Sequence, residues 1–394
     1  MLTDFLAKHF IKDYQNVKNP KVRERYGVLG GVVGICCNVL LSAAKLIAGT
    51  LTGAISITAD ALNNLSDAGS SIVTLCGFKM AGKPADDQHP FGHGRIEYVS
   101  GLIVSMVILL MGFELIKSSI EKIVHSESMS FSILSLIILL CSVALKLWMA
   151  FFNRGLGKKI DSAAMKATAM DSLSDVAATS AVVIGLLVFH FTGVSIDGYI
   201  GVVVACFIMY TGYQTAKDTL SPLLGQAPDP QFVHSIEEKV LAYPDVVGVH
   251  DLIVHNYGPG RSVVSLHAEV PCHIDILKIH DTIDNIEREL KAEFQCECVI
   301  HMDPIVTNDE TVNAMHAKVA QLVRSIDEQM SIHDFRMVAG PSHTNLIFDV
   351  MVPHGFHLSD EQVVSAIRDE VKKLDKTFEV VIDVDKSYLS LDKK

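Results

Sequence analysis

The sequence has little charge and no surplus of basic residues. Only 20% of its 394 residues are charged, and the formal net charge is −12. A protein that binds nucleic acid needs a basic footprint, so we exclude that class. Hydrophobic residues make up 49% of the chain and the mean hydropathy is +0.34, which is more apolar than is usual for a soluble protein of this length. The composition therefore favours a membrane protein.

Several common motifs are missing from the chain. The 8 cysteines have no paired spacing, which argues against a disulfide framework and fits a reducing cytosol. The N-terminal segment is polar and basic, without an apolar core, so we expect no cleaved signal peptide. No Gly-x-x-x-x-Gly-Lys-Ser/Thr phosphate loop occurs, and no nucleophile stands beside a base. We therefore expect neither an ATP-driven pump nor an enzyme, and no bound cofactor.

Apolar residues are concentrated in the first 220 positions, where six stretches are long enough to cross a bilayer as helices. These stretches lie near 28–51, 55–78, 98–118, 130–152, 168–191 and 196–217. Acidic residues interrupt the second and the fifth, so a simple hydropathy window can miss them. We predict a six-helix membrane domain over residues 28–220, preceded by a cytoplasmic segment of residues 1–27.

Basic residues mark one side of the membrane. They precede the first span, as at Arg25, and occupy the loops after the second and fourth spans, as at Arg95 and Arg154. The loops after the first and fifth spans contain no lysine or arginine. Because positively charged loops stay in the cytoplasm, we predict a multi-pass membrane protein with both termini on the cytoplasmic side.

The remaining polar tail contains an internal repeat. Residues 228–305 and residues 308–388 each have the pattern helix, strand, strand, helix, strand. His250-Asp251 in the first copy is echoed by His333-Asp334 in the second. The strands alternate apolar and polar residues, as expected for a sheet with one covered face. We predict a cytoplasmic α+β ferredoxin-like domain over residues 228–305 and a second repeat of it over residues 308–388.

Polar residues at helical spacing interrupt two of the membrane spans. Asn63 and Asp67 are four residues apart in the second span, and so are Asp171 and Asp175 in the fifth. Residues at this spacing share one face of a helix, so two such faces can surround one point with oxygen atoms. Ionisable groups in hydrocarbon are costly and usually mark an ion path. The alternative for a single acid is a position at a helix end or pairing with a lysine, for which Lys45 and Lys146 are available. Two matching pairs on two spans make that alternative the less favoured one.

The donor atoms of these two pairs restrict the metal. Carboxylate and amide oxygens are hard ligands, suited to Mn²⁺, Mg²⁺ or Ca²⁺, whereas Zn²⁺ favours nitrogen and sulfur. Three acids around one point repel one another unless protons or a cation neutralise them. Metal binding would then displace protons, and protonation would expel the metal. Asp60 lies one heptad before Asp67, where it joins a proton path or sits near the water-facing helix end.

These motifs resemble the cation diffusion facilitator family over about residues 10–305. The resemblance rests on the two spaced pairs, on the loop segment 84–95, and on the tail residues His250, His267 and Asp303. It implies a dimeric metal/proton antiporter with Asn63, Asp67, Asp171 and Asp175 as the transport site. Zinc-transporting members have Asp or His at the first position and His at the third. Asn63 and Asp171 are instead similar to the manganese-exporting branch.

The same resemblance implies two further metal sites. A loop site is implied at Asp86, His89 and His93. A cytoplasmic regulatory site is implied at His250, His267, His280, His301 and Asp303. In the second repeat the equivalent positions are His333, Asp349, Asp383 and Asp385. His301 and Asp303 alternate along one predicted strand and so share a face. For the loop and tail sites, the alternative is solvated polar residues without metal.

The sequence thus predicts a divalent cation exporter in which Mn²⁺ is the transported ion and a candidate regulatory metal. Export of Zn²⁺, Fe²⁺ or Cd²⁺ by the same mechanism is the nearest alternative. A membrane metal sensor, with a tail that signals to a partner, is the alternative of another class. The family resemblance adds a homodimer and a bacterial inner membrane location. Metal ions, protons and the lipid bilayer are the expected partners.

Overall fold

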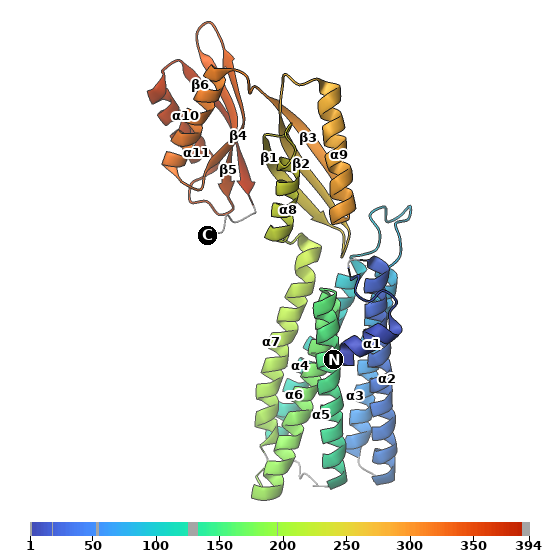
Figure 1. Ribbon diagram of the computed structural model, residues 1–394. Helices are drawn as coiled ribbons and strands as arrows, with labels where there is room; N and C mark the ends of the chain where they lie inside the picture. The colour runs from blue at the N-terminus through green and yellow to red at the C-terminus, as the bar shows by residue number, and fades with distance from the viewer. Residues whose placement is uncertain (1, 18, 53–54, 125–132, 195, 388–394) are drawn as a thin grey trace. The chain divides into compact units, whose positions relative to one another are not determined.

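The computed structural model describes residues 2–17, 19–52, 55–124, 133–194 and 196–387. They form two compact units (Figure 1): a helical unit that extends to Gln226 and includes Asn256–Arg261, and an α+β unit made of the rest. The last helix of the first unit ends at Leu224. Gly225 follows it with φ of 93°, a left-handed conformation that glycine adopts readily.

The described residues of the helical unit form one short helix and six long ones. They are α1 (Leu2–Phe10), α2 (Pro20–Thr52), α3 (Ile55–Ala81), α4 (Ile96–Val124), α5 (Ile133–Lys159), α6 (Ala163–Thr192) and α7 (Asp197–Leu224). Within the described residues, five helices are long and apolar enough to cross a membrane, namely α2, α4, α5, α6 and α7. Helix α3 has 27 residues but carries the polar residues noted above, so the sixth span stays a prediction.

Several helices are longer than the apolar stretches predicted for them. Helix α2 begins at Pro20, well before the stretch predicted near 28–51, and α5 ends at Lys159 beyond the stretch near 130–152. In both cases the added turns contain basic residues, such as Arg25 and Lys158. Hydropathy detects only the apolar part of a helix, whereas the backbone hydrogen bonds continue through the polar turns.

Glycines of α2 allow α3 to pack closely against it. A Cβ atom at Gly31 would lie 2.6 Å from the Leu75 Cβ, and one at Gly34 would lie 2.6 Å from the Ser71 Oγ. Neither distance is possible for a real side chain at those positions. Small residues at a helix interface let two backbones approach and gain dispersion contacts within a bilayer. Helix α3 is therefore part of the bundle despite its polar residues.

A buried ion pair joins three helices at one end of the bundle. Arg23 of α2 donates to Glu97 of α4, with Nη2 2.8 Å from Oε1 and Nε 3.2 Å from Oε2. Ser162, the N-cap of α6, donates its hydroxyl to Glu97 Oε1 at 2.6 Å. Glu97 is 2% exposed. A two-pronged, charge-assisted contact of this kind fixes orientation as well as distance, so it orients α2, α4 and α6.

The α+β unit contains two modules with the same order of elements. The first module comprises α8 (Pro230–Leu241), β1 (Gly248–Asn256), β2 (Ser262–Pro271), α9 (Ile276–Phe294) and β3 (Cys296–Ile305). The second module comprises α10 (Glu310–Ile326), β4 (Ser331–Ala339), β5 (Thr344–Pro353), α11 (Asp360–Leu374) and β6 (Phe378–Ser387). The sheet orders are β1-β2-β3 and β4-β5-β6, and the pairs β2/β3 and β5/β6 are parallel.

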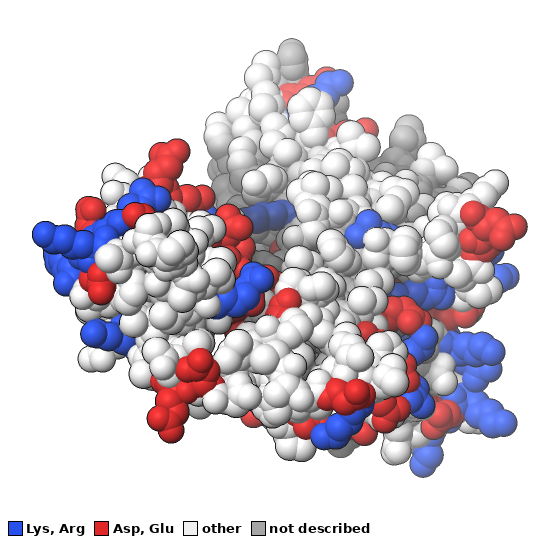
Figure 2. All heavy atoms as spheres, turned by 90° about the horizontal axis from the view of Figure 1, so that it is seen from above, with Lys and Arg blue, Asp and Glu red and all other residues white. Residues whose placement is uncertain are grey.

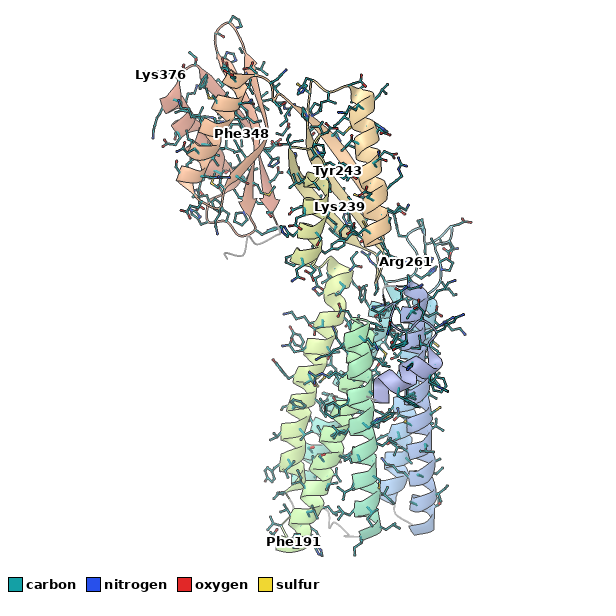
Figure 3. The ribbon with its side chains drawn as sticks, viewed as in Figure 1. Phe191, Lys239, Tyr243, Arg261, Phe348 and Lys376 are labelled. Atoms are coloured by element: carbon teal, nitrogen blue, oxygen red, sulfur yellow. The ribbon has the colours of Figure 1, made fainter. Side chains whose placement is uncertain are left out.

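Each module buries one face of its sheet beneath its two helices. Leu266 in the first core and Phe348 in the second (Figure 3) are at most 1% exposed. Burial alternates along β2 and β5, as the sequence pattern predicted. The alternation leaves His267 and Asp349 on the uncovered faces, where polar side chains can gather. Seen from above, the surface of the described residues has acidic and basic side chains interspersed among uncharged ones (Figure 2).

Candidate metal sites

Three carboxylates of α3 and α6 gather around Lys146 of α5. The Lys146 Nζ lies 2.6 Å from Asp67 Oδ2 and 2.6 Å from Asp175 Oδ2. Lys146 is 3% exposed, and Asp67 and Asp171 are each 4% exposed. Asp171 precedes Asp175 by about one helical turn, and its Oδ1 is buried without a hydrogen-bond partner among the described residues. We call Asp67, Lys146, Asp171 and Asp175 the carboxylate cluster.

A hydroxyl pair fixes α3 against α6 beside this cluster. The Oγ1 atoms of Thr74 and Thr168 are 2.9 Å apart, and both residues are buried. Ala167, next to Thr168, is fully buried and packs in one apolar cluster with Val104 and Ile108 of α4. Thr168 lies just under one turn before Asp171, so this contact joins α6 to α3 close to the carboxylate cluster.

The four residues of the cluster have a formal charge of −2, since three carboxylates contribute −3 and Lys146 contributes +1. The buried Lys45 of α2 is near enough to Asp67 to interact with it electrostatically, so the site as a whole is net negative by about one charge. Uncompensated charge away from water is costly. A divalent cation bound among the carboxylates would neutralise it, and its ligands would be oxygen atoms only. Hard oxygen donors suit Mn²⁺, Mg²⁺ or Ca²⁺. The lysine ammonium contacts Asp67 Oδ2 and Asp175 Oδ2, which such an ion would use, so an ammonium and a metal would compete for these oxygens.

Asn63 and Asp60 are less closely tied to the cluster. Asn63 is exposed, and within the described residues no hydrogen bond or ion pair joins it to the three carboxylates. Its neighbour Asn64 is 3% exposed and accepts a hydrogen bond from Lys45 Nζ at 3.0 Å. The side chain of Asp60 lies outside the described residues. A role for Asn63 as a metal ligand therefore stays a prediction.

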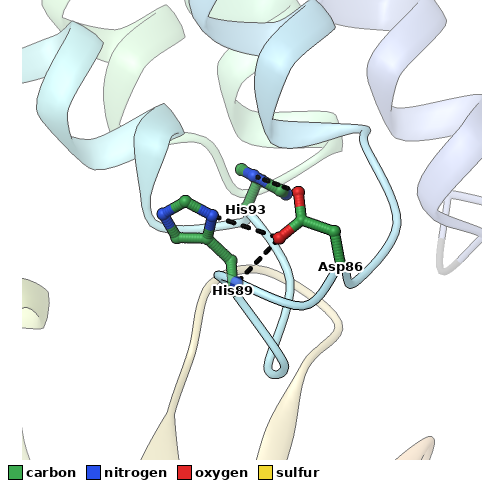
Figure 4. Close-up of side chains that lie close together, drawn as sticks. All are labelled: Asp86, His89 and His93. Carbon is green, nitrogen blue, oxygen red and sulfur yellow. Dashed lines mark hydrogen bonds and ion pairs between the residues drawn. The ribbon is translucent and has the colours of Figure 1, made fainter.

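The loop between α3 and α4 brings Asp86, His89 and His93 together (Figure 4). Asp86 Oδ1 lies 3.3 Å from His89 Nδ1, and Asp86 Oδ2 lies 3.4 Å from His93 Nε2. The two imidazole rings are 4.5 Å apart between centroids. His93 Nδ1 lies 3.1 Å from the Pro84 carbonyl oxygen. A hydrogen bond donated there would leave Nε2 free as a metal donor, a common arrangement for metal-binding histidines.

Local hydrogen bonds keep the loop carboxylate ionised. The His89 backbone N–H donates to Asp86 Oδ1 at 2.7 Å, and this contact holds the pKa of Asp86 below its usual range. Metal ligands must be deprotonated, so Asp86 is ready to bind at neutral pH. Two nitrogens and a carboxylate in an exposed loop suit a divalent transition metal.

In the first module, Asp303 of β3 lies at the centre of a histidine group. Its Oδ2 lies 2.9 Å from His267 Nδ1 and 3.2 Å from His250 Nε2, and its Oδ1 lies 3.3 Å from His301 Nε2. The strand register pairs His267 with His301, which puts both on the uncovered face. His280 is exposed on α9 and lies outside this group of close atoms.

The second module has a more acidic group at the matching positions. His333 Nε2 lies 3.3 Å from Asp385 Oδ2 and 3.9 Å from Asp349 Oδ2. The register pairs Asp349 with Asp383, as it pairs the corresponding histidines in the first module. Burial raises the pKa of both Asp349 and Asp385. Asp383 is exposed and lies beside the closely spaced group of three.

Sequence reasoning gave too little weight to two residues. The sequence offers Lys146 only as one of two lysines able to pair with a membrane acid, yet it bridges two carboxylates of different helices. Asp251 was noted only as part of a repeated dipeptide, yet it lies near both His250 and His333. The repetition of His-Asp at equivalent positions was a usable signal for Asp251. A lone lysine in an apolar span was the corresponding signal for Lys146.

Comparison with known proteins gives matches over most of the chain. Residues 31–224 match the family model of the cation efflux transmembrane domain, and residues 228–305 match that of the cation efflux protein cytoplasmic domain. An uncharacterized transporter of Methanocaldococcus jannaschii is 30% identical over 273 residues, which is 69% of this chain and 96% of the relative. The manganese efflux system protein MneS of Bacillus subtilis is 29% identical over 288 residues, 72% of this chain and 99% of the relative. The cation-efflux pump FieF of Cronobacter sakazakii is 26% identical over 266 residues, which is 67% of this chain and 88% of the relative.

Proposed function

Because the chain belongs to the cation diffusion facilitator family and is a cation efflux transporter, we propose that it exports Mn²⁺ in exchange for protons by alternating access. The observation that supports this most directly is the carboxylate cluster, in which buried acids of two helices meet at one cation. We assign Asp67, Asp171 and Asp175 as ligands of the transported ion, with Asn63 as a fourth ligand.

Lys146 acts in this proposal as an internal cation that holds the empty site together. Its ammonium contacts Oδ2 of both Asp67 and Asp175, so an entering metal ion displaces it from at least one of them. The flexible four-carbon stem of lysine allows this withdrawal. When the metal leaves, the returning ammonium and incoming protons neutralise the carboxylates, which otherwise repel one another.

Manganese is favoured by two independent arguments. The proposed ligands are oxygen atoms only, and such sets suit hard cations better than Zn²⁺. One relative is also named as a manganese efflux system protein. Carboxylate sites bind Zn²⁺, Fe²⁺ and Cd²⁺ as well, and another relative is named only as a cation-efflux pump. Export of one of these ions by the same mechanism is the main alternative.

A membrane metal sensor remains the alternative of another class. The histidine and aspartate groups of the two modules support it, because they offer metal donors far along the chain from the carboxylate cluster. Its weakness is that a sensor has no use for three buried carboxylates in a helical bundle, where each one is costly.

The proposal includes the membrane arrangement and the assembly. Helix α3 is the sixth span, both termini are cytoplasmic, and the protein is a homodimer in a bacterial inner membrane. The second module is a duplicate of the first, which is supported by the same element order and by the same parallel pairing in both. The multi-pass character itself follows from the family and from five apolar helices among the described residues.

Transport in proteoliposomes with an imposed pH gradient tests the proposal. We expect Mn²⁺ flux coupled to opposite proton flux, and a loss of at least tenfold in Asp175→Asn. Asp161→Asn is the matched control, because the Asp161 side chain is 90% exposed and its carboxylate forms an ion pair with Lys166 at the surface. Zn²⁺ flux without Mn²⁺ flux would mean that the transported ion is Zn²⁺ and not Mn²⁺. No flux of either ion in folded protein would favour the sensor.

A further inference from the structure

The two modules of the α+β unit present histidines to each other. The rings of His250 in β1 and His333 in β4 have centroids 4.1 Å apart. Their side chains are only 5% and 9% exposed. Carboxylate oxygens lie 3.2 Å and 3.3 Å from the two Nε2 atoms, but no hydrogen bond of acceptable geometry reaches either nitrogen within the described residues. Two buried imidazole nitrogens thus lack a proper partner on one shared surface.

Asp251 completes a donor set that spans the two modules. One ligand atom from each of His250, Asp251 and His333 lies within 4.8 Å of the other two. Metal–nitrogen and metal–oxygen bonds are about 2.0–2.2 Å long, so donors around one ion are separated by roughly 3–4 Å. Small side-chain movements would bring the three atoms to that spacing. A groove of about 1410 Å³, lined by these residues and by others of both modules, gives an ion access.

The backbone has the same unusual conformation after each of the two histidines. Asp251 has φ of 50° and Asp334 has φ of 51°, in the left-handed region that residues other than glycine rarely adopt. The pairing register of β4 with β5 also shifts between His333 and Arg336. Irregularities of this kind re-aim side chains and are common at functional sites. Asp334 N donates to Glu269 Oε1 at 2.8 Å, which links the second module to the first.

A plain polar interface does not account for this arrangement well. Leaving a buried nitrogen without a partner costs about 1–3 kcal/mol, and here two such nitrogens belong to rings whose centroids are 4.1 Å apart. A cation bound by the two imidazoles and Asp251 would also neutralise the Asp251 carboxylate. The mixed nitrogen and oxygen donors suit a divalent transition metal such as Mn²⁺, Fe²⁺ or Zn²⁺ more than Mg²⁺ or Ca²⁺.

We propose that His250, Asp251 and His333 bind one divalent transition metal ion that joins the two modules as a clamp. Neither module holds all three ligands, so the site exists only when the modules are paired within one chain. The ion is separate from the one carried by the carboxylate cluster. The proposal does not depend on the transport function, and its test uses no transport measurement.

Controlled cleavage between the modules tests the clamp on the full chain. A protease site inserted within residues 306–309, between β3 and α10, allows the linker to be cut after purification in detergent. The protein is held on a resin by an N-terminal tag, and release of the second module is measured with Mn²⁺ or Zn²⁺ and after chelation. We expect retention with metal and release that is at least about tenfold faster after chelation, since a metal ion that binds only the paired modules favours pairing by about tenfold at a concentration of about ten times its Kd.

Three variants assign the effect to the proposed ligands. Asp251→Asn and His333→Gln should release the second module in the presence of metal and bind one ion fewer per chain. Asparagine tolerates a positive φ, so Asp251→Asn keeps the backbone even if His333→Gln perturbs folding. His273→Gln alters an exposed histidine that belongs to none of the proposed metal sites and should keep the module attached. Retention that ignores chelation, or an unchanged metal content in Asp251→Asn, would overturn the proposal.

Discussion

Lys146→Met removes the internal cation of the carboxylate cluster and keeps an unbranched side chain of similar length. The Lys146 ammonium makes two ion pairs of 2.6 Å with carboxylates of two other helices. Removing one partner of a buried ion pair costs about 3–5 kcal/mol, because the opposite charge stays buried without compensation. We therefore expect the metal-free variant to lose about that much free energy of unfolding.

The same change should strengthen metal binding. In the proposed cycle the metal ion takes the place of the ammonium, so the variant loses stability mainly in its metal-free state. A destabilisation of about 3 kcal/mol confined to that state corresponds to a Kd for Mn²⁺ that is lower by roughly 100-fold. Turnover should nevertheless fall, because the Lys146 ammonium no longer returns to help release the ion.

Thermal unfolding of purified protein over a range of Mn²⁺ concentrations measures both effects, since ligand binding raises the melting temperature by a predictable amount. Lys166→Met is the matched control, because it removes the same charge from an exposed ion pair with Asp161. If folded Lys146→Met bound Mn²⁺ no more tightly than the parent, competition between lysine and metal would be refuted, and Lys146 would have a structural role only.

Three other features of the structure lead to further predictions: a buried ion pair, a core side chain and a buried thiol. Glu97→Ala leaves Arg23 unpaired at a buried junction and should reduce the free energy of unfolding by about 3–5 kcal/mol, seen as a lower melting temperature; an unchanged value would show that the junction contributes nothing. Phe348→Ala empties a core position that is 1% exposed and should cost about 3–5 kcal/mol, with faster hydrogen exchange in the second module but not in the first. Burial raises the pKa of Cys298 to about 12, so near pH 8 it should alkylate much more slowly than exposed Cys272, and equal rates in peptide mass spectrometry would contradict this.

The sequence alone determined features that depend on local periodicity. The spacing of Asp171 and Asp175 predicted two carboxylates on one helix face because an α-helix repeats every 3.6 residues. Alternation along β2 and β5 predicted which strand residues are buried. The short loop segment around His89 contained a complete donor group within a few residues. Such features need no knowledge of how distant segments pack.

Only the tertiary structure decided which distant side chains meet. Lys146 is 79 residues from Asp67 and 29 from Asp175, and their contact depends on how three helices are rotated about their axes. The same rotation buries Asn64 and exposes Asn63, although either fits a polar helix face in sequence. The meeting of His250 with His333 depends on how two modules dock. Rotation and docking result from packing of many side chains at once, and no short stretch of sequence contains that information.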